Sequence, residues 1–306
     1  MKDIKISKNR LGMNLYETEL DCGMTFYFMP LPSKVNIRSM HLFTKFGSID
    51  EKFVTGEDKK VVHVQDGTAH FLEHCAFYNE NGKDALEEIS KMGCYGNAWT
   101  NFDHTTYYIH TTNNDRQKSL EYLINFVTAP YFTEAVVKKE QGIISQEIAR
   151  ANDNISSILY NNLRKGLFVK HPLRKPILGN IDSIMNITTD ELMFAHNTFY
   201  HPSNLRLILF IPEENVSDYI LMLEKINEKF EKKGKPSYLY VDEPKEVNSK
   251  RIITEGNVAE NLVALGFKGN MGDSENLLKQ LQANDLLLSC LFSSTTSSVE
   301  KLIKKG

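Results

Sequence analysis

Hydrophobic and polar positions alternate along the first part of the chain and then change to a helical spacing. Three strands are predicted by alternating or strongly apolar runs, at residues 12–19, 24–31 and 35–46. Four stretches have the 3.6-residue period of helices, at residues 63–78, 83–91, 115–128 and 133–152. A further pair of strands is expected at 97–101 and 105–111. This order favours an α+β fold in which helices cover one face of a mostly antiparallel sheet.

A second domain is predicted after residue 250. Residues 233–249 are rich in Lys, Glu and Pro and lack a sustained period, which indicates a linker after a first domain at 1–232. The strand and helix pattern then begins again, with strands expected at 251–255 and 261–268 and a helix at 274–291. We therefore expect residues 250–306 to be the beginning of a second, related domain that is truncated where the chain ends.

Composition limits the classes of protein that this chain resembles. Its 306 residues are 41% hydrophobic and carry a net charge of -3 with interspersed signs, so no nucleic-acid partner is expected. The start of the chain lacks a signal-peptide pattern and no stretch is apolar enough for a membrane span, which predicts a cytoplasmic protein without a membrane partner. Four cysteines lack paired spacing and are expected to be free thiols: Cys22, Cys75, Cys94 and Cys290.

The segment His-Phe-Leu-Glu-His at residues 70–74 carries the strongest chemical signal. In a helix, His70 and His74 stand on one face, so both imidazoles reach a single ion, and Glu73 lies beside them. The order reverses the commoner His-Glu-x-x-His arrangement, in which the Glu acts as a general base. Asp66 and Thr68 are expected to cap the helix. The alternative is an ordinary pair of surface or core histidines on an amphipathic helix.

Two carboxylates lie on the apolar side of the helix predicted at 133–152. Glu140 and Glu147 follow the stripe of apolar residues formed by Val136, Val137, Ile143, Ile144 and Ile148. Burying an unpaired charge costs several kcal/mol, so this placement indicates a compensating cation. Seven residues span about 10 Å of helix, so one Glu is expected to bind the ion and the other to support it. The alternative is a slightly rotated helix with both carboxylates in water.

Together these residues resemble the inverted zincin metallopeptidases, a family that includes pitrilysin, insulin-degrading enzyme and the mitochondrial processing peptidase. Glu147 follows His74 with 72 residues between them, which is similar to the spacing of the third ligand in that family. Further segments resemble the family in the same order, at residues 47–51, 96–100, 103–107, 171–172, 176–179 and 200–204. The resemblance spans roughly residues 10–235 and implies a pitrilysin-like metalloenzyme domain.

The resemblance also implies roles for individual residues. His70, His74 and Glu147 would hold Zn²⁺ as the cofactor, and Glu140 would support these ligands. Glu73 would take a proton from a zinc-bound water and return it to the leaving amine.

An extended peptide would pair with the strand that contains Asn97, Ala98 and Trp99. The alternative for these three residues is an ordinary exposed sheet edge with one anchoring aromatic side chain.

The expected function is a zinc-dependent metalloendopeptidase that hydrolyses peptide bonds in small or unstructured peptides. In an alternative, the chain is the zinc-binding half or a scaffold subunit of a two-chain peptidase complex and is inactive alone. A second family chain or the missing C-terminal half would then complete it. Its intact His-Phe-Leu-Glu-His segment speaks against a purely structural role, since non-catalytic partners of this kind usually lose the His or Glu positions.

Overall fold

A computed structural model describes most of the chain, at residues 3–8, 12–80, 84–112, 115–212, 215–256, 261–269 and 276–305. The chain divides into two compact units, Met1–Leu265 and Gly266–Gly306. The first unit contains both sheets and all of the predicted site residues. The domain boundaries expected at residues 232 and 250 stay a prediction.

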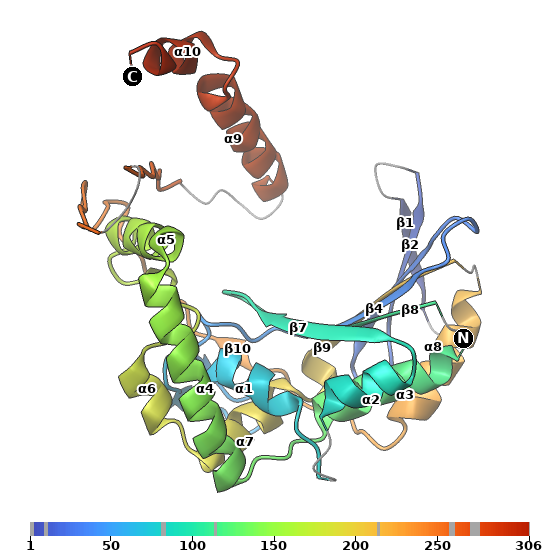
Figure 1. Cartoon of the computed structure of the whole chain (residues 1–306). Coiled ribbons are helices and arrows are strands. Elements are labelled where there is room, and N and C mark those ends of the chain that lie inside the picture. Colours follow the sequence, from blue (N-terminus) through green and yellow to red (C-terminus); the bar gives the residue numbers. More distant parts are fainter. Residues whose placement is uncertain are drawn as a thin grey trace. The chain divides into compact units, whose positions relative to one another are not determined.

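A seven-stranded sheet forms the centre of the first unit (Figure 1). Its strands in spatial order are β1 (Lys5–Lys8), β2 (Asn14–Glu19), β3 (Thr25–Pro30), β9 (Leu205–Ile211), β4 (Arg38–Thr44), β8 (Thr105–Thr111) and β7 (Tyr95–Thr100). Every neighbouring pair is antiparallel except β3 and β9, where Phe28 lies opposite Leu209 in a parallel register. The predicted α+β class with a mostly antiparallel sheet is therefore confirmed.

The two faces of this sheet differ because side chains alternate along each strand. Met40, Leu42 and Ile109 are fully buried on the face that the helices cover. This helical layer includes α2 (Ala85–Lys91), α3 (Arg116–Thr128), α7 (Thr189–Phe199) and α8 (Val216–Asn227), as Figure 1 shows. The other face carries Tyr95, Asn97 and Trp99 on β7, and we call it the open face.

A second, three-stranded sheet lies in the same unit. Its order is β10 (Ser237–Tyr238), β5 (Lys52–Val54) and β6 (Val61–His63), and both pairs are antiparallel. The helix expected at 63–78 therefore begins too early in the prediction, since β6 occupies the residues up to His63. Pairing with β5 satisfies the backbone of this segment, which a short sequence window does not reveal. β10 lies within the stretch predicted as a linker.

The remaining helices of the first unit include the two that carry the predicted site, α1 (Thr68–Ala76) and α4 (Glu134–Asp153). The others are α5 (Ile155–Leu167) and α6 (Ile181–Asn186), with short 3₁₀ helices η1 (Pro172–Arg174) and η2 (Pro202–Asn204). Thr133 begins α4 because its hydroxyl accepts a hydrogen bond from the backbone N–H of Val136. α1 packs against both α4 and β7, which brings three distant parts of the sequence to one place (Figure 1).

The second unit contains two helices, α9 (Leu277–Phe292) and α10 (Ser297–Ile303). α9 agrees with the helix expected at 274–291, although residues 274–275 lie outside the described part. The strands expected at 251–255 and 261–268 are wrong, because neither segment pairs with a strand among the described residues. Val263 and Phe267 stay 81% and 72% exposed. An apolar run forms a β-strand only where a neighbouring strand pairs with its backbone.

Two further expectations concern the state of the cysteines and the presence of a membrane-spanning helix. All four cysteines are free thiols, as predicted: Cys22, Cys75 and Cys94 are buried and Cys290 is exposed. Cys75 packs in the core rather than beside the histidine rings. In the part of the chain that the structure describes, no helix has the length and apolar character needed to cross a bilayer.

Candidate metal centre

The start of α1 is set by a glycine. Gly67 occupies the N-cap position with φ 90°, in place of the expected Asp66 or Thr68. A Cβ at this position would lie 2.7 Å from the carbonyl oxygen of Leu178, so only glycine fits both the backbone angle and the space. The Asp66 carboxylate instead accepts a hydrogen bond from Lys175 at 2.8 Å. The direction of α1 is thus determined by contacts with the loop around residues 175–179.

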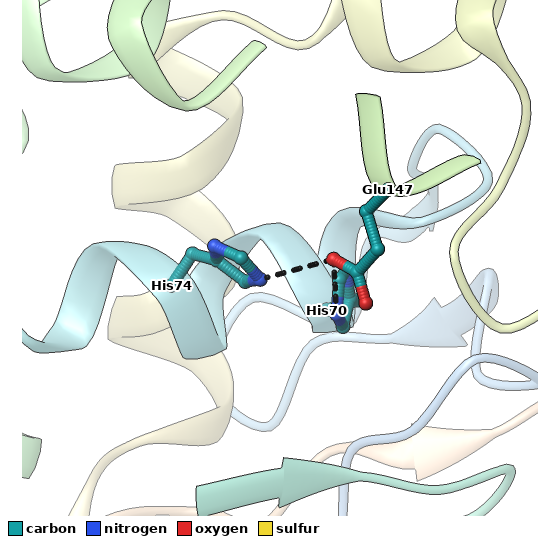
Figure 2. Close-up of side chains that lie close together, drawn as sticks. All are labelled: His70, His74 and Glu147. Carbon is teal, nitrogen blue, oxygen red and sulfur yellow. Dashed lines mark ion pairs between the residues drawn. The ribbon is translucent and has the colours of Figure 1, made fainter. Parts of the chain in front are cut away.

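His70, His74 and Glu147 bring their side chains together between α1 and α4 (Figure 2). One ligand atom from each residue lies within 4.8 Å of the others. Oε2 of Glu147 is 3.6 Å from Nε2 of His74 and 3.8 Å from Nε2 of His70. Two ligand atoms on a tetrahedral zinc ion are about 3.3–3.5 Å apart. The three donors therefore fit one ion after a small contraction.

Glu140 supports His74 from the other side of the ring. Its Oε2 lies 2.8 Å from Nδ1 of His74, and its Oε1 accepts a hydrogen bond from the Tyr78 hydroxyl at 2.5 Å. The Glu140 residue is only 3% exposed, which rules out the alternative in which both carboxylates of α4 are solvated. Because Nδ1 of His74 faces a carboxylate, its Nε2 is left to face Glu147.

The negative charges around His74 favour a positive charge at this position, either a protonated imidazole or a bound metal ion. Burial by itself would lower the pKa of this imidazole, but the carboxylates of Glu140 and Glu147 outweigh burial and raise it to about 9. Burial and the neighbouring His74 lower the pKa of His70 to about 4. The hydrogen bond with His74 holds the pKa of Glu147 below its usual value. A site of two imidazoles and two nearby carboxylates has the donor chemistry that zinc prefers.

The two histidines are oriented by different means. Nδ1 of His70 is buried and has no hydrogen-bond partner among the described residues, whereas Nδ1 of His74 is held by Glu140. Packing rather than a polar contact therefore orients the His70 ring, whose centre lies 4.7 Å from that of His74. The residues present fit a zinc ion, and the His74 imidazole is more firmly oriented than that of His70.

Glu73 lies on α1 next to the cluster and is held by β7. The hydroxyl of Thr100 donates a hydrogen bond of 2.7 Å to Oε2 of Glu73. Burial raises the pKa of Glu73, and the contact with Thr100 opposes that shift. A carboxyl group whose pKa moves toward neutrality is suited to accept and return a proton. Thr100 was not assigned a role from the sequence, although it ends the segment 96–100 that carries the family resemblance.

Tyr78 is the second site residue that sequence reasoning missed. It follows His74 by four residues, so the two side chains project from nearly the same side of the chain at the end of α1. This spacing was the signal that could have indicated a shared partner, and Glu140 is that partner. The Tyr78 hydroxyl satisfies the second oxygen of a buried carboxylate, which would otherwise lack a donor.

The predicted substrate edge is the last strand of the large sheet. β7 pairs with β8 on one side, and no described strand pairs with its other side. Asn97 and Trp99 are exposed, whereas Ala98 is half-buried. The side chain of Asn97 accepts a hydrogen bond from the backbone N–H of Ala98. An unpaired strand edge so close to Glu73 can pair with an extended peptide.

Comparisons with known proteins agree with this combination of fold and site. The sequence model of the family described as Insulinase (Peptidase family M16) matches residues 62–181. Zinc protease YmfH of Bacillus subtilis is 36% identical over 314 residues, covering 98% of this chain and 70% of that protein. An M16-like peptidase from Alicyclobacillus acidocaldarius superposes with a TM-score of 0.84 at 30% identity, covering 98% of this chain and 70% of the other.

The human mitochondrial-processing peptidase subunit beta is 30% identical over 138 residues, covering 44% of this chain and 28% of that protein. The gathering of two imidazoles and a carboxylate between two helices, taken together with these matches, places the chain among the metallopeptidases. The chain belongs to peptidase family M16, the insulinase family, whose members similar to it include zinc proteases.

Replacing Glu140 should weaken zinc binding without abolishing it. In Glu140→Gln the charged partner of His74 Nδ1 is lost, and such supporting contacts are worth about 10–100-fold in metal affinity. We expect a loss of that size in a competition titration against a chromophoric chelator. Glu134→Gln, an exposed position on the same helix, is the matched control and should bind zinc like the unmodified chain. Equal affinities for both variants would contradict a supporting role for Glu140.

Proposed function

We propose that this chain is a zinc-dependent endopeptidase that hydrolyses peptide bonds in small or unstructured peptides. The observation that carries the proposal is the convergence of His70, His74 and Glu147 within 4.8 Å, beside a half-buried Glu73. In this proposal those three residues hold the zinc ion. Membership of a family with zinc proteases supports it.

In this proposal each residue of the site has a separate role in hydrolysis. Zinc, when bound, polarises a carbonyl group and lowers the pKa of a water molecule toward about 7. Glu73 takes a proton from the attacking water on its carboxylate and then donates this proton to the leaving amine nitrogen. Thr100 holds that carboxylate in place, and Glu140 orients the His74 ring so that its Nε2 faces the centre.

The substrate would bind as an added strand along β7. Its backbone would pair with the edge formed by Asn97, Ala98 and Trp99, since main-chain hydrogen bonds hold an extended segment regardless of its sequence. Unstructured peptides fit this requirement because their backbone groups are free to pair. Folded proteins do not, because their backbone groups are already paired.

Mass-spectrometric mapping of cleavage in a mixed library of unstructured peptides tests the proposal. The zinc-loaded chain should produce cuts that disappear when the metal is removed by a chelator and return when zinc is added back. The readout is the set of new peptide termini. A chain that binds one equivalent of zinc and produces no cuts would count against a self-sufficient peptidase.

A second candidate is the zinc-bearing half or a scaffold subunit of a two-chain peptidase. The observation in its favour is the similarity to a protein named as a subunit, the mitochondrial-processing peptidase subunit beta. The chain also spans only 70% of YmfH. In this case adding a second family chain, or the remaining C-terminal segment of a longer relative, should raise turnover at least about tenfold. Unchanged turnover after both additions would argue for the single-chain proposal.

Replacing Thr100 should lower the turnover number more than it weakens substrate binding. Thr100→Val keeps the shape of the side chain but removes the 2.7 Å hydrogen bond to Glu73, and a bond to a charged group is worth about 1.5–3 kcal/mol. We expect kcat to fall roughly tenfold while zinc content is retained. Thr100→Ser retains the hydroxyl and should keep most of the activity. A Val variant with full kcat would show that Glu73 is positioned without this contact.

A further inference from the structure

Four connected hydroxyl groups lead from the interior of the first unit to Glu73. The hydroxyl oxygens of Tyr107 and Tyr200 are 3.0 Å apart, and a further side-chain hydrogen bond joins Tyr200 to Thr105. The Thr105 hydroxyl donates to Oγ1 of Thr100 at 3.3 Å, and Thr100 in turn donates to Glu73 at 2.7 Å. We call Tyr107, Tyr200, Thr105 and Thr100 the hydroxyl chain. It ends on the carboxylate that we propose as the proton acceptor.

Strand register and the end of a helix bring these hydroxyl groups together. Thr100 of β7 lies directly opposite Thr105 of β8, so both side chains project to the face of the sheet that the helices cover. Tyr107 follows two residues later on β8 and faces the same way. Tyr200 is the residue that ends α7, one of the helices in that layer. The hydroxyl chain therefore joins two strands and a helix that are far apart in the sequence.

Burial makes these hydroxyl groups costly unless each is paired. Tyr107 and Thr105 are fully buried, and Tyr200 is only 1% exposed. Phe and Val would fill nearly the same space without a polar atom to satisfy, so packing alone does not explain these residue types. The hydrogen bonds of the chain remove the cost of burial, and they direct all of its members toward one carboxylate.

The number of protons determines the direction of donation. Thr105 has one hydroxyl proton, which two acceptors share: the Phe46 carbonyl oxygen at 2.9 Å and Oγ1 of Thr100 at 3.3 Å. Thr105 therefore accepts in its contact with Tyr200, and Tyr200 accepts from Tyr107. Hydrogen bonds that point the same way polarise one another, which strengthens the last of them, from Thr100 to the ionised carboxylate.

We propose that Thr105 and Tyr200 are positioning residues for hydrolysis, which hold the Thr100 hydroxyl in the orientation in which it donates to Glu73. The inference rests on the proposed peptidase function and adds the groups that keep its base in place. Without the bond from Thr105, the Thr100 side chain can turn to another staggered position, and Glu73 then loses a fixed donor. Thr105 and Tyr200 are too deeply buried to touch a substrate, so their effect belongs to catalysis rather than to binding.

Steady-state kinetics of Thr105→Val and Tyr200→Phe on the best library peptide test the proposal. We expect kcat to fall about fivefold in the first variant and about two- to threefold in the second, because each loses a hydrogen bond between neutral groups. KM and zinc content should stay within about twofold, since neither residue contacts the substrate or the metal ligands. Thr105→Ser keeps the hydroxyl and should retain most of the turnover. Tyr219→Phe, which alters another buried tyrosine on α8, is the control and should keep full kcat.

Combined substitutions show whether the effect passes through Thr100. In a chain that already carries Thr100→Val, the further change Thr105→Val should alter kcat by less than about 1.5-fold, because the link to Glu73 is already broken. Losses of kcat that multiply in the double variant would overturn the proposal, since Thr105 would then act independently of Thr100. Full kcat in both Thr105→Val and Tyr200→Phe would overturn it as well.

Urea unfolding of the same zinc-loaded variants gives a readout that requires no cleavage. The midpoint should fall less in the double variant of Thr100 and Thr105 than the two single losses add up to, because one hydrogen bond is counted in both. Thr18→Val is the control. Thr18 is a buried threonine on β2 whose hydroxyl donates to the Asp3 carbonyl, so its loss should add fully to that of Thr100→Val.

The two readouts separate this inference from the proposed function. Coupled unfolding midpoints without any peptide cut would support the hydroxyl chain and count against the peptidase function. Peptide cuts at an unchanged kcat in both single variants would leave the peptidase function standing and overturn the positioning role. Additive midpoints for Thr100 and Thr105 would overturn the chain of hydrogen bonds itself.

Discussion

Glu73→Gln should bind zinc like the unmodified chain and lose peptide hydrolysis by about 10³-fold or more. The amide keeps the size of the side chain and can still accept the hydrogen bond from Thr100, but it cannot take a proton from water at neutral pH. Glu73 is not among the three converging donors, so zinc stoichiometry should stay at one ion per chain. Initial rates on the best library peptide, beside metal analysis of the same sample, measure both effects.

Glu87→Gln is the matched control for this substitution. Glu87 is an exposed carboxylate on α2 that pairs with Lys91, so the same change of charge is made away from the cluster. Its rate should stay within about twofold of the unmodified chain, since exposed ion pairs contribute little. If Glu73→Gln hydrolysed peptides as fast as this control, another group would have to act as the base.

Glu147→Ala should lose most of the zinc affinity, by roughly 10²–10³-fold, because one of three protein donors is removed. The two remaining imidazoles come from successive turns of α1 and their ring centres stay 4.7 Å apart, so weak binding should persist. The dissociation constant from a chelator competition and the ion content after dialysis report the loss. Hydrolysis at saturating zinc then shows how far the remaining ligands support the reaction.

Gln146→Ala provides the comparison on the same turn of α4. Gln146 is exposed and precedes Glu147, so its removal leaves the helix and the donor cluster in place. We expect its zinc affinity to match that of the unmodified chain. Equal affinity for Glu147→Ala and Gln146→Ala would show that the third donor is a different group, which would redirect the proposal for this centre.

Much of the first unit was predictable because its elements follow short-range periods. The strands at residues 12–46 alternate with period 2, and α3 and α4 follow the helical period from caps at Asp115 and Thr133. Segments whose structure depends on pairing with a distant strand were less predictable. The helix expected at 63–78 began at His63, which is the last residue of β6, and the unpaired segments 251–255 and 261–268 were expected to be strands. Pairing decides such segments, and it depends on residues far along the chain.

The sequence alone determined the local part of the site. His70, Glu73 and His74 lie within five residues, so a single helix places them together whatever surrounds it. The tertiary structure decided the rest. It turned Glu140 toward His74 across 66 positions and Glu147 toward both rings, which the residues of α4 by themselves left open. It also brought Thr100 to Glu73 across 27 positions. Periodicity determines which side of a helix a residue occupies, whereas only packing between elements determines what that side meets.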